Sequence, residues 1–190
     1  MKIGVTWNFF IQDFEQSFGE KIEIIRPEDS LQDYDIIIFP GGEDISPSIY
    51  GKKNKYSFPN KKRDKIELKI LEKALKTDAF ILGVCRGHQL INAFFGAEVI
   101  QDIEIELGLY HPPQHEILKT KEYLPEMVNS IHHQGILFPG NGLKTTSTYC
   151  NIVESCESDN RKILTVQFHP EFMDCQDFFS YVKEKKNVRN

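Results

Sequence analysis

Residues 80–89 read FILGVCRGHQ, an apolar run that ends at a cysteine placed between two glycines. The apolar part predicts a buried strand at 80–85, and RGHQLINAFFG at 86–96 predicts a helix that begins directly after it. Gly83 and Gly87 relieve the crowding that side chains would cause at a sharp strand-to-helix turn. This stretch therefore predicts a strand, a tight turn and a helix, with Cys85 at the turn.

Strand and helix patterns alternate on both sides of this unit. Further strands are predicted at 2–7, 21–27, 34–42, 97–103, 115–120, 143–149 and 162–168, and amphipathic helices at 63–77 and 175–186. Continuous apolar runs are typical of parallel strands that are buried on both faces and joined by crossover helices. We therefore predict one α/β domain over residues 1–190, with a mostly parallel central sheet flanked by helices and an antiparallel edge.

Composition excludes several classes of protein. The chain has 190 residues, a net charge of -5 and no apolar stretch near the ~20 residues that span a bilayer. Its acidic balance argues against a general nucleic-acid binder, and its first residues lack a signal-peptide pattern. The four cysteines form no C-x-x-C pair, so we expect all four to be free thiols. We expect a cytoplasmic protein without a nucleic-acid or membrane partner, whose oligomeric state the sequence leaves open.

Cys85 has the residues around it that a nucleophile needs. G-x-C-x-G at 83–87 is the thiol form of the nucleophile elbow, and a helix N-terminus favours the thiolate. A plain buried cysteine is the alternative until a base is found. In TVQFHPEF at 165–172, Pro170 favours an extended His169, so His169 and Glu171 point the same way. Because parallel strands end at one edge of a sheet, we predict a Cys85, His169 and Glu171 triad.

A glycine turn follows another predicted strand in FPGGEDISPSIYG at 39–51. The backbone N–H of Gly41 or Gly42, together with that of Arg86, could form an oxyanion hole for a tetrahedral intermediate. An ordinary Gly-Gly turn is the alternative.

These motifs together resemble the class I glutamine amidotransferases, flavodoxin-like enzymes that hydrolyse a γ-glutamyl amide through a thioester. GVCRGHQ and VQFHPE carry that resemblance. PGGEDISPSIYG, RDKIE, VIQDI and NSIHHQG are similar to the branch of γ-glutamyl-γ-aminobutyrate hydrolases. The resemblance implies that Cys85 is the nucleophile, His169 the general base and acid, and Glu171 its orienting partner, and it assigns the oxyanion hole to Gly42 and Arg86.

The same resemblance implies a set of substrate-binding residues. Gln89 would hold the glutamyl group, and His132, Gln134 and Gly135 would clamp its α-amino and α-carboxylate groups. No cofactor is implied. No metal is expected either, since the adjacent pair His132 and His133 lacks a third ligand at suitable spacing. The chain is shorter than typical members of the branch before NSIHHQG, which leaves the acceptor side of the pocket undefined.

A basic loop follows the glycine turn, with Lys52, Lys53, Lys55, Lys61, Lys62 and Arg63 in GKKNKYSFPNKKRD at 51–64. It is either a solvated loop, with Arg63 paired to Asp64 and Glu67, or a binding site for an anionic leaving group. In the second case Lys52, Lys53 and Arg63 would contact that group. On this feature the sequence also resembles the γ-glutamyl-CDP-amidate hydrolases of capsule phosphoramidate biosynthesis.

The function expected from these features is that of a cysteine-dependent hydrolase. It would release free L-glutamate from a small γ-glutamyl amide or phosphoramidate conjugate through a γ-glutamyl thioester. γ-Glutamyl-CDP-amidate, or a similar anionic conjugate, is the expected substrate. The alternatives are a γ-glutamyl-γ-aminobutyrate hydrolase, a glutaminase subunit that supplies ammonia to a synthase, and a non-catalytic thiol sensor.

Overall fold

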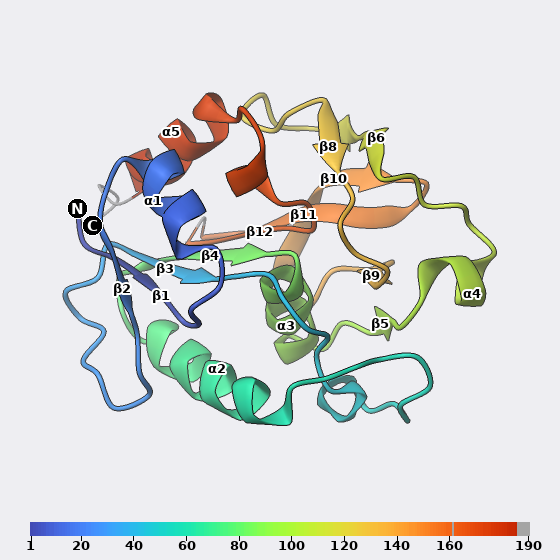
Figure 1. Ribbon diagram of the computed structural model, residues 1–190, viewed down its shortest axis with the longest axis horizontal. Coiled ribbons are helices and arrows are strands. Elements are labelled where there is room, and N and C mark those ends of the chain that lie inside the picture. Colours follow the sequence, from blue (N-terminus) through green and yellow to red (C-terminus); the bar gives the residue numbers. More distant parts are fainter. Residues whose placement is uncertain (161, 186–190) are drawn as a thin grey trace.

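A central eight-stranded sheet organises the computed structural model, which describes residues 1–160 and 162–185 (Figure 1). The strands lie in the order β2 (Ile22–Ile24), β1 (Ile3–Val5), β3 (Ile36–Phe39), β4 (Phe80–Val84), β12 (Ile163–Val166), β11 (Ile152–Ser158), β10 (Leu143–Tyr149) and β7 (Leu118–Lys119). The first five are parallel, and β11, β10 and β7 continue the sheet in antiparallel fashion. The predicted α/β fold with an antiparallel edge is confirmed.

Helices cover both faces of the parallel part of the sheet. On one face lie α1 (Ile11–Phe18) and α5 (Gln176–Glu184), and on the other lie α2 (Lys61–Ala74) and α3 (Arg86–Phe94) (Figure 1). The remaining elements are α4 (Ile103–Leu107), the 3-10 turns η1 (Pro47–Tyr50) and η2 (Pro170–Phe172), and two small antiparallel pairs. Those pairs join β5 (Val99–Ile100) to β9 (Gly135–Ile136), and β6 (Gln114–Glu116) to β8 (Met127–Asn129).

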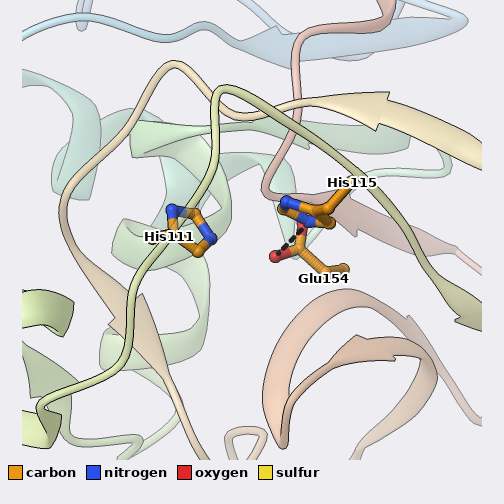
Figure 2. Close-up of side chains that lie close together, drawn as sticks. All are labelled: His111, His115 and Glu154. Atoms are coloured by element: carbon orange, nitrogen blue, oxygen red, sulfur yellow. Dashed lines mark ion pairs between the residues drawn. The ribbon is translucent and has the colours of Figure 1, made fainter.

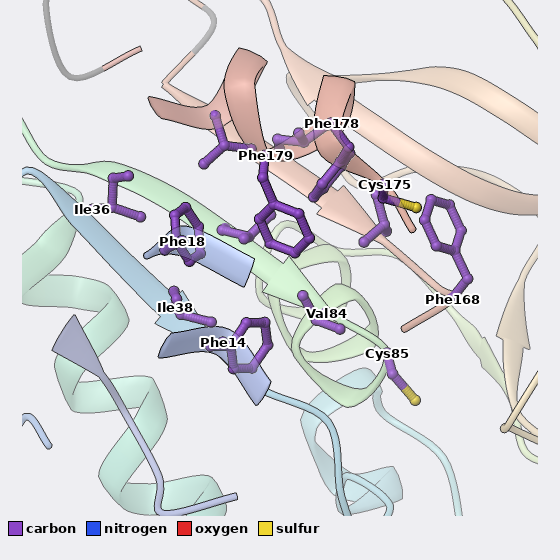
Figure 3. Close-up of a cluster of buried hydrophobic side chains, with 14 of the residues drawn as sticks. Phe14, Phe18, Ile36, Ile38, Val84, Cys85, Phe168, Cys175, Phe178 and Phe179 are labelled. Carbon is purple, nitrogen blue, oxygen red and sulfur yellow. The ribbon is translucent and has the colours of Figure 1, made fainter. Parts of the chain in front are cut away.

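The apolar runs of the sequence supply two separate cores. Because successive side chains of a strand point to opposite faces, Ile36 and Ile38 of β3 enter one core while Ile37 and Phe39 enter the other. Figure 3 shows the first core, in which Phe14 and Phe18 of α1 and Phe178 and Phe179 of α5 pack on the sheet. A strand with apolar residues on only one face could not fill both cores.

Gly87 sets how closely α3 packs on β3. A Cβ atom added there would lie 2.0 Å from the carbonyl oxygen of Phe39, well inside van der Waals contact. One at Gly83 would meet the backbone of Gly87 at 2.8 Å. The two glycines that frame Cys85 are therefore required by the close approach of helix and strand.

Several sequence-based element predictions are corrected. The strand predicted at 97–103 is only β5, because the side chain of Asp102 accepts a hydrogen bond from the Ile105 N–H and so caps α4. The strand predicted at 115–120 divides into β6 and β7, which pair in different sheets. The sequence analysis did not predict α1 or β11, and residue 186 of the predicted last helix lies outside the described residues.

Candidate active site

Cys85 occupies the turn between β4 and α3 in a strained backbone conformation. Its φ of 50° and ψ of -103° place a non-glycine residue at positive φ, where crowding of the Cβ atom is costly. The Cys85 N–H is held by the Val166 carbonyl at 2.8 Å. The side chain is 5% exposed and lies at the edge of the first core (Figure 3), with Sγ 3.9 Å from the Ile131 carbonyl oxygen. The turn thus has the elbow geometry that the sequence predicts.

His169 and Glu171 form a buried pair at the end of β12. His169 Nδ1 lies 2.7 Å from Glu171 Oε1, and the two residues are 3% and 7% exposed. Burial alone would lower the pKa of His169, but charge attraction and hydrogen bonding from Cys85, with Glu171 adding to them, raise it to about 10. The ring therefore favours the imidazolium form and lies between the Cys85 sulfur and the Glu171 carboxylate. The structure brings Cys85, His169 and Glu171 together, as predicted.

Asn129 fixes the backbone of His169, a contact that sequence analysis did not predict. Its Nδ2 donates to the His169 carbonyl at 2.8 Å, and its Oδ1 accepts from the His169 N–H at 2.9 Å. The imidazole itself stacks on Phe172 and meets the edge of Phe10. Asn129 opens the NSIHHQG stretch, but nothing in one sequence links that amide to a histidine 40 residues away.

The predicted oxyanion residues lie on two loops beside Cys85. Gly42 has a φ of 137°, and a Cβ atom there would lie 2.2 Å from Arg63 Nη1. A Cβ atom on Gly41 would lie 3.1 Å from His169 Nε2, so this loop passes directly against the imidazole. Arg86 is the first residue of α3, where backbone N–H groups have no acceptor within the helix. Gly42 thus has a backbone conformation that suits glycine, and the Arg86 N–H has no acceptor within its helix.

A buried charge network supports these two loops. Arg86 donates to Glu67 and, at 2.5 Å, to Asp64, while Arg63 donates to Glu67 at 3.2 Å and to the Pro40 carbonyl at 2.8 Å. Each of these four charged side chains is at most 5% exposed. The network links α2 to the residue after Cys85 and to the glycine loop, which is why a buried arginine is tolerated at each end.

Arg63 is consequently not at the mouth of the site. The prediction that it contacts a leaving group is corrected, because its side chain is 0% exposed and its guanidinium is hydrogen-bonded to Glu43, Glu67 and Pro40. The alternative, that Arg63 pairs with acids of its own helix, holds for Glu67. Lys52 is half-exposed and pairs with Glu98 at 2.8 Å, and the Lys53 side chain is exposed. Neither lysine is tied to the buried network.

The predicted substrate-binding residues are joined by hydrogen bonds. The Gln134 carbonyl lies 2.8 Å from His132 Nδ1 and accepts from Gln89 Nε2 at 3.5 Å. The Gln134 side chain donates to Ser57 Oγ at 2.8 Å. Gly135 lies in β9 and is paired with Ile100 of β5. Burial and the neighbouring His111 hold the pKa of His132 well below its usual range. Gln89, His132 and Gln134 thus form one cluster that extends to the basic loop through Ser57.

His133, by contrast, joins two other loops. Its Nε2 lies 3.1 Å from Asp44 Oδ1 and its Nδ1 lies 3.3 Å from Asp102 Oδ2. Hydrogen bonding to Asp44 raises the pKa of His133 in spite of partial burial. The adjacent histidines of NSIHHQG therefore face different partners and do not form a shared metal site.

A cleft of about 700 Å³ lies between α1 and α5, and Glu171 and Phe172 are on its wall. Neither Cys85 nor His169 lines it.

Within the described part of the chain, no helix has the length and apolar character needed to cross a membrane.

Comparisons with known proteins agree with this architecture. Residues 23–171 match the family Peptidase C26. A Lactococcus lactis protein described as glutamine amidotransferase-like (YvdE) is 37% identical, with 90% of this chain and 82% of that protein covered. A subunit of the glutamine-hydrolyzing GMP synthase of Sulfurisphaera tokodaii is 28% identical, with 88% and 85% covered.

Solved structures show the same fold. A glutamine amidotransferase from Thermotoga maritima superposes with a TM-score of 0.67 at 15% identity, over 96% of this chain and 82% of that one. At that identity the likeness concerns the fold alone, whereas the family match covers most of the chain. The chain belongs to the Peptidase C26 family and has the class I glutamine amidotransferase fold.

Proposed function

We propose that this protein is a cysteine-dependent γ-glutamyl hydrolase that releases free L-glutamate, with γ-glutamyl-CDP-amidate or a similar anionic conjugate as its substrate. One observation carries the proposal: a strained Cys85 at a helix N-terminus interacts with a buried His169 that is itself 2.7 Å from Glu171. A structural cysteine needs neither the strain nor the imidazolium. Family membership supports hydrolysis of an amide-like bond.

The reaction follows from these groups. The Cys85 sulfur attacks the γ-carbonyl carbon, and the resulting oxyanion accepts hydrogen bonds from the Gly42 and Arg86 N–H groups. The bond from carbon to nitrogen breaks as His169 gives its proton to the leaving nitrogen, which leaves a γ-glutamyl thioester. Water then gives a proton to His169 and attacks the thioester, and glutamate leaves as the thiolate re-forms. Glu171 keeps the imidazole oriented throughout.

Access to the thiol requires a local movement. The Ile131 carbonyl lies 3.9 Å from Sγ, and a reacting carbonyl must come within about 3–3.5 Å of the nucleophile. The side chain of Ile131 is 59% exposed, so the chain around it can move without emptying a core. Substrate binding therefore displaces the backbone at Ile131 and exposes Cys85.

The basic loop supports an anionic leaving group. Its Ser57 hydroxyl accepts a hydrogen bond from the Gln134 side-chain amide, which places the loop directly beside the predicted glutamyl-binding cluster. The Lys55 N–H and the Lys53 carbonyl are both held by the Gln101 side chain, so the backbone is ordered while the lysine side chains stay exposed. Exposed ammonium groups on an ordered loop suit a phosphate, which binds Lys as a point charge.

The test is glutamate release from γ-glutamyl-CDP-amidate, γ-glutamyl-γ-aminobutyrate and glutamine. We expect the wild type to turn over the nucleotide conjugate fastest and Cys85→Ala to abolish release from all three. Cys150→Ser, which alters an exposed thiol, is the matched control and should retain full activity. We expect Lys52→Met with Lys53→Met to raise KM for the nucleotide conjugate several-fold and to leave γ-glutamyl-γ-aminobutyrate unaffected. Lys65→Met is the control for loss of a lysine charge.

Other outcomes would select an alternative. Preference for γ-glutamyl-γ-aminobutyrate would reject the phosphate-bearing leaving group and keep the mechanism. Turnover of glutamine alone would indicate a glutaminase that supplies ammonia, the role that the name of the Sulfurisphaera relative suggests. Release that survives in Cys85→Ala would reject Cys85 as the nucleophile. Absence of release with every substrate in a folded wild type would reject the hydrolase and leave the thiol sensor.

A further inference from the structure

Two histidines and a glutamate converge at a place that the proposed hydrolysis does not use. His111 and His115 come from the segment between α4 and β8, and Glu154 comes from β11 (Figure 2). One ligand atom from each side chain lies within 4.8 Å of the other two. Glu154 follows both histidines by more than 35 positions along the chain, so only the fold brings the three residues together.

Two of the three side chains are buried, and their polar atoms lack hydrogen-bond partners. Glu154 is 0% exposed and His115 is 5% exposed. Among the described residues, neither carboxylate oxygen of Glu154 and neither ring nitrogen of His115 has a hydrogen-bond partner. Such groups ordinarily cost free energy when they are buried without a partner. They point to a ligand that would bind the Glu154 carboxylate and one ring nitrogen of His115.

A simple His115 and Glu154 ion pair does not account for the arrangement. His115 Nε2 lies 3.4 Å from Glu154 Oε1, which is too long for a charge-assisted hydrogen bond but close to the separation of two ligands on one metal. Metal bonds of about 2.0–2.2 Å in tetrahedral geometry place donor atoms about 3.3 Å apart. The second histidine, His111, has no role in a pair, whereas it completes a set of three ligands.

The surroundings orient the two rings as ligands. His111 Nδ1 lies 2.8 Å from Ser130 Oγ, an outer contact of the kind that fixes a metal-binding imidazole. The His115 ring stacks on Tyr149 with 3.9 Å between centroids.

We propose that His111, His115 and Glu154 bind one Zn²⁺ ion. Two imidazoles and one carboxylate are a ligand set that zinc uses in proteins, with a fourth position left for water. The ion supplies positive charge to a buried carboxylate that has no other cation beside it in the described residues. The donor atoms lie within 4.8 Å of one another, so bonding geometry requires a movement of at most about 1.5 Å, which the half-buried His111 can make.

Zinc at this position would fasten the 111–115 segment to the central sheet beside the candidate active site. Ser130 contacts both His111 and His132, and the preceding Asn129 holds the backbone of His169. The proposed metal site and the proposed base His169 are therefore both supported by the Asn129–Ser130 stretch, although His169 is not a metal ligand. Its role is to position this stretch.

The experiment is zinc binding by the metal-free full chain that carries Cys85→Ala. This background removes the rival site in which Cys85 and His169 could bind zinc. We expect one zinc per chain by calorimetry and elemental analysis, and a rise in Tm on adding zinc. Glu154→Gln and His115→Ala in the same background should each lower the affinity at least tenfold. Glu157→Gln, which alters another buried carboxylate of β11, is the matched control and should bind as before.

Several results would overturn the proposal. Absence of zinc binding in a folded Cys85→Ala chain would do so, as would unchanged affinity in both Glu154→Gln and His115→Ala. Circular dichroism of the variants separates lost binding from lost folding, and Glu154→Gln preserves side-chain shape if His115→Ala fails to fold. In the wild type, Co²⁺ should give tetrahedral visible bands without a thiolate charge-transfer band. Appearance of that band would instead place the metal on a cysteine, and its loss in Cys85→Ala would identify that residue.

Discussion

Cys85 combines backbone strain with a charged partner, and each feature has its cause in a few named residues. Its positive φ is maintained because Gly83 and Gly87 admit the close packing of α3 on β3 and β4. Its imidazolium partner is maintained because Glu171 and Cys85 together outweigh the burial of His169. The reactivity we propose for Cys85 is a property of the residues around it.

The pKa of His169 gives a direct test of this arrangement. We expect NMR titration of the imidazole to give a pKa near 10, well above the usual 6.5. In Cys85→Ala the negative partner is gone, so the protonated form is less favoured and the pKa should fall by more than one unit. Glu171→Gln should lower it for the same reason. An unchanged pKa in both variants would show that His169 does not interact with either residue.

At the scale of elements, α2 carries the charge network that sets the two loops around Cys85. Thr6 of the loop after β1 donates to Glu67 at 2.7 Å, and Ser46 donates its hydroxyl to Asp64 at 2.5 Å. Arg86 brings in the first turn of α3. A single turn of one helix thus fixes three loops at the carboxyl ends of parallel strands, where α/β proteins place their sites.

Arg63→Met tests whether that network is structural. Removing the guanidinium leaves Glu67 facing one partner fewer and the Pro40 carbonyl without its donor. Loss of one member of a buried ion pair costs about 3–5 kcal/mol, so urea unfolding should show a loss of that order. Lys65→Met, an exposed site on the same helix, should change stability by less than about 0.5 kcal/mol. Unchanged stability with a raised KM would restore Arg63 as a substrate contact.

At the scale of the whole molecule, the sheet has a protected centre and two weak edges. β4 and β12 are paired on both sides and covered on both faces, whereas β2 and β7 are short edge strands with exposed residues. Native-state hydrogen exchange should therefore show β4 and β12 amides opening only with global unfolding. Amides of β2 and β7 should exchange at least tenfold faster. Equal protection throughout would mean that the edges unfold only with the centre.

The antiparallel half of the sheet was harder to predict than the parallel half. β11 is buried along its whole length, but it carries Glu154, Ser155, Glu157 and Ser158. These polar residues give it no apolar pattern from which a strand could be predicted. α4 shows the reverse problem, since Ile103, Ile105 and Leu107 alternate like a strand while an Asp102 cap makes a helix. α1 begins at Ile11, and its N-cap residue Phe10 makes no side-chain cap hydrogen bond, so no start signal marks the helix. Local pattern fails where tertiary contacts override it.

Residue order alone was enough to predict the α/β fold and the three residues of the proposed triad, because both depend on local patterns. An apolar strand that enters a glycine turn has few other solutions, and parallel strands bring the residues after them to one edge of the sheet. The folded structure was needed to show that Arg63 is buried and not a leaving-group contact, that Asn129 holds His169, and that His111 and His115 meet Glu154. These contacts join distant segments through side chains, and periodicity along a chain carries no record of them.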